Sequence, residues 1–302
     1  MQAVSPVESE VPGLDARAAH RWHRAASGPS PWLHEEVARR MIDRLGWFRA
    51  QPASWLHWEP LSGGVQAHRT LAERLPRAAV HFHTRHRTET LRAIASPGAG
   101  WWNPARWGWS RGAAPLEQDT QVDLLWANMQ LHHEPLPQTL LKRWHRHVAI
   151  DGFLMFSCLG PDSLKELRGV YQREGWPGPC HGFTDMHDWG DMLVHSGFAE
   201  PVMDMERIVL TYTSGEAVLA ELRTLGRNLN TERFPGLRGR RWRTELVRAI
   251  ESGLPRTADQ RLQLTFEIVY GHAFKPRPRA PSPSQQNVSL QEMRAMLRGQ
   301  RP

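Results

Sequence analysis

The histidines of this chain are the first residues whose chemistry and spacing could make a reactive site. The chain contains 16 of them, and two groups are closely spaced: His81, His83 and His86, and the pair His132 and His133. Imidazole is a common metal ligand in proteins. Neither group belongs to a His-Glu-x-x-His motif or to a matching carboxylate set, so the sequence predicts no metal site. His132 is instead a candidate for substrate contact or for a structural role.

The sequence also shows no arrangement that is typical of a nucleophilic enzyme. Cys158 lies in an apolar run, where a thiol is normally inert, and its spacing to Cys180 fits no metal site. A Gly-x-Ser-x-Gly motif and a phosphate-binding loop are both absent from the sequence. Two cysteines in 302 residues favour reduced thiols in a cytoplasmic protein.

The segment from Val122 to Arg168 has the pattern of a ligand-positioning unit. An apolar run at 122–129 predicts a buried strand, and apolar residues at helical spacing after Pro137 predict a helix. A turn is expected at Asp151-Gly152, then a strand at 153–157. Ser163-Leu-Lys-Glu166 is a capping-box pattern that would open another helix. This order predicts a right-handed parallel unit with its ligand at the carboxyl ends of the strands.

The other predicted elements place this unit in one α/β domain. Helices are expected at 35–45, 65–75, 88–95 and 214–225, and strands at 54–58, 79–84, 202–212 and 261–270. We divide the chain into a flexible segment at 1–30, a domain at 31–276 with helical insertions at about 174–195 and 214–253, and a disordered basic tail rich in Pro, Ser and Gln at 277–302.

The charge distribution indicates a basic surface in the last quarter of the chain. The net charge is +7, and 16 basic against 6 acidic residues follow from Arg223 onward, compared with 22 and 25 before it. Such a surface suits nucleic acid, an acidic carrier protein or solvent alone. Four tryptophans at 101–109 lie among arginines and could stack nucleobases, but a local aromatic cluster is the more common outcome, so nucleic-acid binding is not expected. The sequence indicates neither a membrane span nor a signal peptide.

Five segments carry a resemblance to a known family: 122–133, 156–168, 183–191, 197–206 and 267–276. With the order of elements, they resemble the class I S-adenosyl-L-methionine-dependent methyltransferases, and among these the biotin-pathway malonyl-acyl-carrier-protein O-methyltransferases. The resemblance covers about 32–276 and is strong after Val122. It implies a Rossmann-like fold with a mostly parallel seven-stranded sheet, an antiparallel last strand and helices on both faces. It also implies methylation of the free carboxyl of a malonyl thioester on an acidic acyl carrier protein.

The first half of the chain departs from the family where the cofactor should bind. The family's acidic residue after the first strand falls near His57, and its first two glycines fall near Glu59 and Leu61. The acid that would hold the ribose hydroxyls falls near Arg85. Two interpretations follow: an active methyltransferase with a remodelled pocket, or a non-catalytic relative that has lost the cofactor and acts through a protein partner.

The resemblance nevertheless implies specific site residues. The candidates for cofactor binding are Gly63, Gly64, Glu59 as a displaced acid, Trp126 and Asn128. The candidates for substrate or carrier contact are His132, Arg240 and Arg241, with Arg223, Arg227, Arg238 and Arg243 beside them. No catalytic residue is predicted, because this chemistry depends mainly on the proximity and orientation of the methyl donor and the carboxylate.

Overall fold

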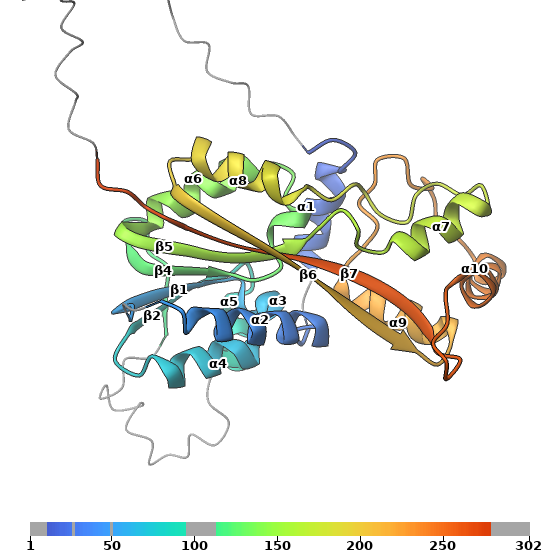
Figure 1. The fold of residues 1–302 in the computed structure, drawn as a ribbon, viewed down its shortest axis with the longest axis horizontal. Coiled ribbons are helices and arrows are strands. Elements are labelled where there is room, and N and C mark those ends of the chain that lie inside the picture. Colours follow the sequence, from blue (N-terminus) through green and yellow to red (C-terminus); the bar gives the residue numbers. More distant parts are fainter. Residues whose placement is uncertain (1–10, 26–27, 49–50, 95–112, 279–302) are drawn as a thin grey trace, which may run out of the picture.

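One mixed sheet organises the protein, for which a computed structural model describes residues 11–25, 28–48, 51–94 and 113–278 (Figure 1). Its seven strands lie in the order β3-β2-β1-β4-β5-β7-β6. They are β1 (Ser54–Trp58), β2 (Ala79–His83), β3 (Ala114–Pro115), β4 (Val122–Ala127), β5 (Val148–Leu159), β6 (Ala199–Tyr212) and β7 (Leu262–Phe274). Strands β1 to β5 pair in parallel, whereas β7 is antiparallel to both β5 and β6. The predicted mostly parallel sheet with an antiparallel last strand is confirmed.

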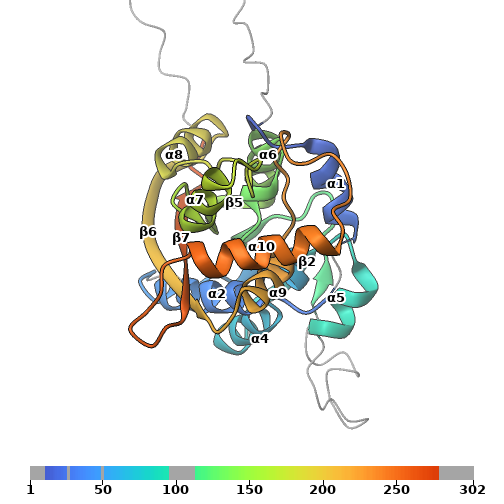
Figure 2. The ribbon, with the colours of Figure 1, turned by 90° about the vertical axis from the view of Figure 1, so that its right-hand side faces the viewer.

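Helices cover both faces of this sheet. On one face lie α2 (Trp32–Leu45), α3 (Pro60–Gly63), α4 (Val65–Arg74) and α5 (Arg87–Ile94), and on the other lie α6 (Pro137–His147) and α8 (Met186–His195) (Figure 1). Helices α7 (Lys165–Arg173), α9 (Gly215–Leu225) and α10 (Arg240–Gly253) gather at one end of the molecule, with α1 (Ala16–Ala25) to one side of them (Figure 2). A 3-10 turn spans Leu131–His133.

Alternating side chains of the central strands make the two halves of the core. In β1, Trp55 packs into the cluster under α2 and α4, whereas Leu56 and Trp58 pack into the cluster under α6 and α8. Strand β4 divides its side chains in the same way, with Trp126 on the first side and Leu125 on the second. Strands buried on both faces read as continuous apolar runs, which is why the sequence revealed them.

The turn predicted at Asp151-Gly152 is wrong, because both residues lie within strand β5. The strand begins at Val148 and runs through both residues, and its pairing with β4 shifts register between Val122 and Leu124. Asp151 adopts a left-handed conformation with φ 64°. Backbone hydrogen bonds from Asp151 to Lys275, and from Lys275 to Gly152, hold this irregular segment in the sheet. The residues that predicted a turn therefore form an irregularity within a strand.

The predicted capping box at Ser163 and Glu166 is also wrong. Helix α7 begins at Lys165, its N-cap Leu164 has φ 58°, and no side chain caps it. The Ser163 hydroxyl donates to the Glu267 carbonyl and accepts from the Glu267 amide. Glu166 accepts hydrogen bonds from the amide and hydroxyl of Thr265. Both side chains fasten α7 to β7, because a distant strand offers them better partners than the helix end does.

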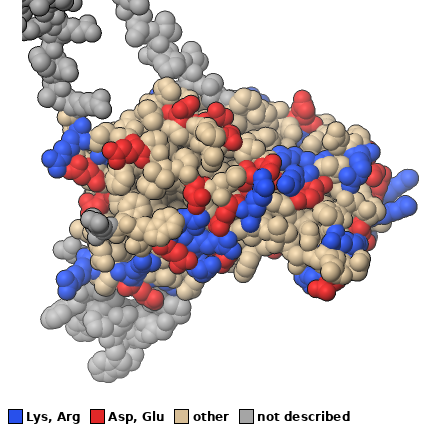
Figure 3. All heavy atoms as spheres, in the orientation of Figure 1, with Lys and Arg blue, Asp and Glu red and all other residues tan. Residues whose placement is uncertain are grey.

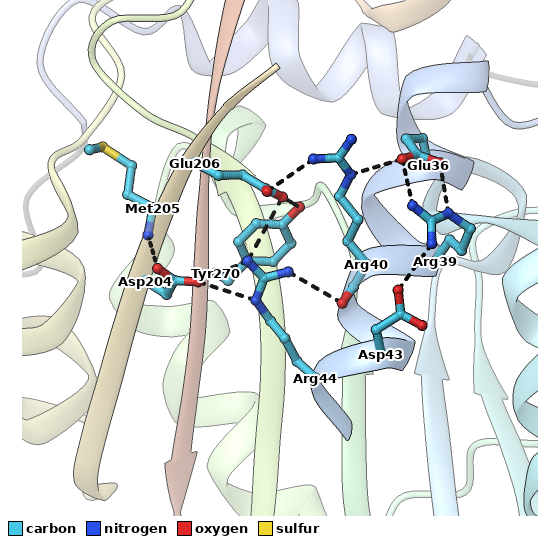
Figure 4. A network of polar contacts seen from close by, with 9 residues as sticks. All are labelled: Glu36, Arg39, Arg40, Asp43, Arg44, Asp204, Met205, Glu206 and Tyr270. Carbon is cyan, nitrogen blue, oxygen red and sulfur yellow. Dashed lines mark hydrogen bonds and ion pairs between the residues drawn. The ribbon is translucent and has the colours of Figure 1, made fainter. Parts of the chain in front are cut away.

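A polar network fixes α2 against β6 and β7 (Figure 4). The Arg40 guanidinium lies 3.0 Å from the Glu206 carboxylate, and that of Arg44 lies 2.8 Å from Asp204. The Tyr270 hydroxyl donates to Glu206, and the Arg44 guanidinium lies over the Tyr270 ring. These contacts hold in place the helix whose first turn adjoins the site described below.

Parts of both ends of the chain, 1–10 and 279–302, lie outside the described residues. Within the segment predicted to be flexible, the helix α1 extends the helical turn that was expected near Ala16, and Leu14 and Ala19 pack with Leu229. The tryptophan-rich stretch at 101–109 and the tail from 279 lie outside the described residues. The domain limits at 31 and 276 stay predictions.

Candidate functional site

The strand order locates a ligand site between β1 and β4. From β1 the chain continues to β2 on one side, whereas β4 and β5 follow on the other side. In parallel α/β sheets, ligands bind outside the carboxyl ends of the strands where the order reverses in this way. Here that edge is formed by Glu59 after β1, by Thr84 and Arg85 after β2, and by the segment 128–134 after β4.

Glu59 is a buried carboxylate at this edge, and only 4% of the residue is exposed. Its backbone is left-handed, with φ 55°. One carboxylate oxygen lies 3.0 Å from the Arg85 guanidinium, and the other accepts from the Arg85 amide and the Thr84 hydroxyl at 3.3 Å each. Burial raises the pKa of the Glu59 carboxyl, while Arg85 opposes that rise. The displaced acid is therefore present, but groups of the chain itself already donate hydrogen bonds to both of its oxygens.

The glycine turn after β1 is also satisfied internally. The Gly63 amide donates to the Glu59 carbonyl at 2.8 Å, and the Gly64 amide donates to the Pro60 carbonyl at 3.0 Å. A Cβ atom on Gly63 would lie 3.1 Å from the His57 ring, and one on Gly64, where φ is 120°, would lie 3.1 Å from the Glu35 carboxylate. Both glycines are needed for close packing, and neither lines the cavity at this edge.

The first turn of α4 is capped from another helix. Glu35 in α2 accepts hydrogen bonds from the amides of Gln66 and Ala67 at 3.1 Å each, and the Ser30 hydroxyl accepts one from the Val65 amide at 3.0 Å. A helix N-terminus with free amides is a common place for an anionic ligand group. At α4 these amides already have protein partners.

Asn128 and Trp126 lie in the core rather than in the cavity. The Asn128 amide group donates to the carbonyls of His34 at 2.8 Å and Gly63 at 2.6 Å, and its oxygen accepts from Ser157 at 2.6 Å. Asn128 thus joins α2, the glycine turn and β5. Trp126 is fully buried, and its indole nitrogen has no hydrogen-bond partner within the described residues. Of the five predicted cofactor residues, the structure brings Glu59 alone to the cavity wall.

The cavity at the switch point has a volume of about 100 Å³. Its walls include Glu59, Leu61, Arg85, His34 and His133, with Trp22 and His23 of α1 above them. Burial lowers the pKa of His34 and of His23 to about 4 and holds that of His133 well below its usual value. The imidazoles of His23, His34 and His133 are therefore neutral at physiological pH.

A much larger cavity, of about 750 Å³, adjoins the first one. His133 and Leu225 line both cavities. The walls of the larger cavity are mainly apolar, and its arginines come from α9, from α10 and from the segment between these helices. They are Arg223, Arg227, Arg238, Arg240 and Arg243. In Figure 3, basic atoms lie at the end of the molecule that carries α7, α9 and α10 and also across the middle of this face, with acidic atoms among them.

The residues predicted to contact the substrate do not all line the same cavity. Arg240 lines the large cavity, whereas Arg241 does not, although both are exposed. His132 is 4% exposed and lines neither cavity; its ring lies 3.9 Å from that of His133, between the ring centres. His133 is the residue that the sequence interpretation missed. The sequence feature that indicates it is the adjacent pair His132 and His133, of which only His132 was predicted to contact the substrate.

Two further properties concern the described residues only. They contain no cluster of three or more His, Cys, Asp or Glu side chains placed to hold a metal ion. Among these residues, no helix has the length and apolar character that crossing a membrane requires.

Solved structures with this fold include methyltransferases. A putative methyltransferase from Bacillus halodurans C-125 superposes with a TM-score of 0.51 and 13% identity, and the match covers 80% of this chain and 100% of that one. The YcgJ protein from Bacillus subtilis gives a TM-score of 0.51 at 10% identity with the same coverage. These similarities show the fold alone and agree with the predicted Rossmann-like architecture.

Sequence relatives are more specific, although no protein-family profile matches the chain. The malonyl-[acyl-carrier protein] O-methyltransferase of Gallionella capsiferriformans (strain ES-2) is 37% identical, over 88% of this chain and 93% of that protein. The protein of the same name from Laribacter hongkongensis (strain HLHK9) is 39% identical, over 90% of this chain and 91% of that protein. The chain belongs to the malonyl-[acyl-carrier protein] O-methyltransferase family.

Proposed function

We propose that the protein is a carboxyl O-methyltransferase that uses S-adenosyl-L-methionine to methylate the free carboxyl of a malonyl thioester carried by an acyl carrier protein. The names of the relatives support this activity over a non-catalytic role, because they match over about nine-tenths of the chain. The structural observation that carries the proposal is the large arginine-rimmed cavity that meets the switch-point cavity at His133 and Leu225.

The large cavity suits an acyl group that ends in a carboxylate. Its volume of about 750 Å³ lies within the roughly 300–1,000 Å³ range of small-molecule sites. Leu159, Leu164, Leu167 and Phe266 supply apolar walls for the thioester and its arm, and the arginines can bind a carboxylate through charged hydrogen bonds. The same arginines at the rim would attract an acidic carrier.

The reaction requires no general acid or general base from the protein. A malonyl carboxylate is ionised at neutral pH and is itself the nucleophile, so the chain has to orient it and exclude water. This agrees with the lowered pKa of His34 and His133 beside the smaller cavity, which keeps these two imidazoles neutral.

The smaller cavity, by contrast, does not fit the cofactor in the described arrangement. A nucleoside joined to an amino acid is a drug-sized ligand, which needs at least about 300 Å³. The cavity has about 100 Å³, and the Glu59 carboxylate at its wall is already paired. The amides of the glycine turn and of the α4 N-terminus, which do not line the cavity, are paired as well. No transfer step is therefore assigned to these residues.

Mass spectrometry of the carrier protein tests the proposed activity. The full chain is incubated with S-adenosyl-L-methionine and malonyl-carrier protein, and we expect the carrier to gain the mass of one methylene group. Acetyl-carrier protein, which lacks a free carboxyl, is the matched control and should stay unchanged. If the malonyl form also stays unchanged at equimolar enzyme, the proposed function is contradicted.

A further inference from the structure

We propose that the ion pair of Glu59 and Arg85 at the wall of the switch-point cavity acts as a latch, and that Arg85 thereby weakens binding of S-adenosyl-L-methionine to this chain. This inference rests on the proposed function, because it concerns how the same site admits its methyl donor. It assigns to Arg85 a role in cofactor affinity that follows from its own contacts.

The latch joins the carboxyl ends of two neighbouring strands. Glu59 follows β1 and Arg85 lies two residues after β2, and the β1 and β2 backbones are also joined by a 2.7 Å hydrogen bond from the Glu59 amide to the His83 carbonyl. The Glu59 side chain is 6% exposed and that of Arg85 is 34% exposed. Glu59 is therefore the buried partner of the latch, and Arg85 is the more exposed one.

Glu59 is the one carboxylate among the described residues that line this cavity. Ribose hydroxyls and a cationic methyl donor would both compete for it. Arg85 already occupies it with a charged hydrogen bond at 3.0 Å, supported by the Arg85 amide and the Thr84 hydroxyl. A cofactor group that binds the same oxygen of Glu59 therefore competes with the guanidinium.

The charge of Arg85 adds a second effect. S-adenosyl-L-methionine carries a sulfonium cation, whereas its demethylated product, S-adenosyl-L-homocysteine, does not. A guanidinium at the cavity wall repels the first ligand more than the second. The latch therefore acts against the substrate form of the cofactor in particular.

Other groups that could bind the cofactor are also paired, through contacts that do not involve Arg85. The amides of Gly63 and Gly64 are bonded within the turn, and the first amides of α4 are bonded to Glu35 and Ser30. These contacts lie on the α2 side and remain when Arg85 is removed. Arg85 is thus the part of the closed site that the substitution of one side chain removes, whereas the other contacts involve backbone amides.

Calorimetric titration with each ligand tests the latch on the full chain. We compare the natural protein with Arg85→Ala, and with Arg87→Ala as the matched control, since Arg87 is exposed two residues away in α5. Arg85→Ala should bind S-adenosyl-L-methionine about tenfold more tightly, the equivalent of one charged hydrogen bond of about 1.4 kcal/mol. The gain for S-adenosyl-L-homocysteine should be smaller, and Arg87→Ala should match the natural protein.

Unchanged or weaker binding by Arg85→Ala would overturn the latch, and so would an equal gain in the Arg87→Ala control. If Arg85→Ala fails to fold, Arg85→Gln keeps a hydrogen-bond donor without the charge and should show a gain of the same sign. The methyl-transfer assay separates this inference from the proposed function. If Arg85→Ala binds S-adenosyl-L-methionine more tightly but no methyl group is transferred to malonyl-carrier protein, the latch is supported and the proposed function is contradicted. If the natural protein transfers the methyl group but the variant does not bind more tightly, the proposed function is supported and the latch is contradicted.

Discussion

The Nδ1 atom of His57 lies 3.2 Å from the Nδ1 atom of His68, and both residues are buried between β1 and α4. One ring must donate and the other accept, so the pair holds a single shared proton in this contact. Burial is the main cause that lowers the pKa of each imidazole, that of His68 to about 4 and that of His57 well below its usual value. The neutral pair fills the position where the family resemblance places an acidic residue.

This pair makes the stability of the protein sensitive to acid. Well above pH 6.5 neither the folded nor the unfolded chain binds protons at these rings, and they contribute no pH dependence. Below pH 6.5 the unfolded chain binds protons that the folded rings exclude, so the free energy of unfolding falls as the pH falls toward about 4. We expect a slope of about 1.4 kcal/mol per pH unit for each such histidine.

Urea unfolding at several pH values between 4.5 and 7.5, a range chosen around the ordinary histidine pKa of about 6.5, measures this slope. His68→Gln keeps a hydrogen-bonding side chain but removes one titrating group, so its slope should be smaller by about 1.4 kcal/mol per pH unit. His187→Gln is a control, because His187 is 80% exposed. The same slope in His68→Gln and in the natural protein would contradict the neutral-pair interpretation.

Asn128 should contribute strongly to stability. Replacing it with Ala leaves the buried carbonyls of His34 and Gly63 and the Ser157 hydroxyl without their partner. We expect a loss of about 2–4 kcal/mol in the free energy of unfolding, because each unpaired buried polar group costs about 1–3 kcal/mol. Gln130→Ala, which removes a half-buried side chain next to it, should cost less than half as much. A loss below about 1 kcal/mol for Asn128→Ala would show that these groups find other partners.

Glu35 and Glu36 are adjacent residues with different expected effects. Glu35 caps the first turn of α4 through two backbone amides, whereas Glu36 pairs with Arg39 and Arg40 on the same helix. Glu35→Ala should lower the free energy of unfolding by about 1–2 kcal/mol, the usual value of an N-cap. Glu36→Ala should cost at most about 1 kcal/mol, because Arg39 is exposed and Arg40 keeps Glu206 as a partner. Equal losses in urea unfolding would contradict the interhelical cap.

Much of the fold was predictable from local patterns. The bounds of β1 match the prediction, and the strict alternation after Arg261 correctly marked β7, because both strands bury side chains at spacings that the sequence displays. The errors at Asp151-Gly152 and at Ser163 have a common cause. In each place a local turn or cap signal gave way to partners in β7 or the segment after it, more than a hundred residues away.

The site was less predictable than the fold for the same reason. Gly63, Gly64 and Asn128 were placed at the correct edge of the sheet, yet their polar groups bond to the Glu59, Pro60, His34 and Gly63 carbonyls. Local sequence shows which residues reach an edge but not which of their atoms are already paired. The Glu59 to Arg85 contact spans two strand ends, so it appears once the sheet is assembled.

The carrier-binding role predicted for Arg240 and Arg241 can now be divided between the two residues. Arg240 lines the large cavity and Arg241 does not, although both begin α10 and are exposed. Arg240→Glu should therefore weaken binding of malonyl-carrier protein more than Arg241→Glu, by at least about tenfold at low salt, because it also places a negative charge beside the bound carboxylate. Binding of the carrier without its malonyl group should fall by similar amounts in both variants. Fluorescence titration at low and high salt measures both forms, and equal effects on the malonyl form would mean that these arginines meet only the surface of the carrier.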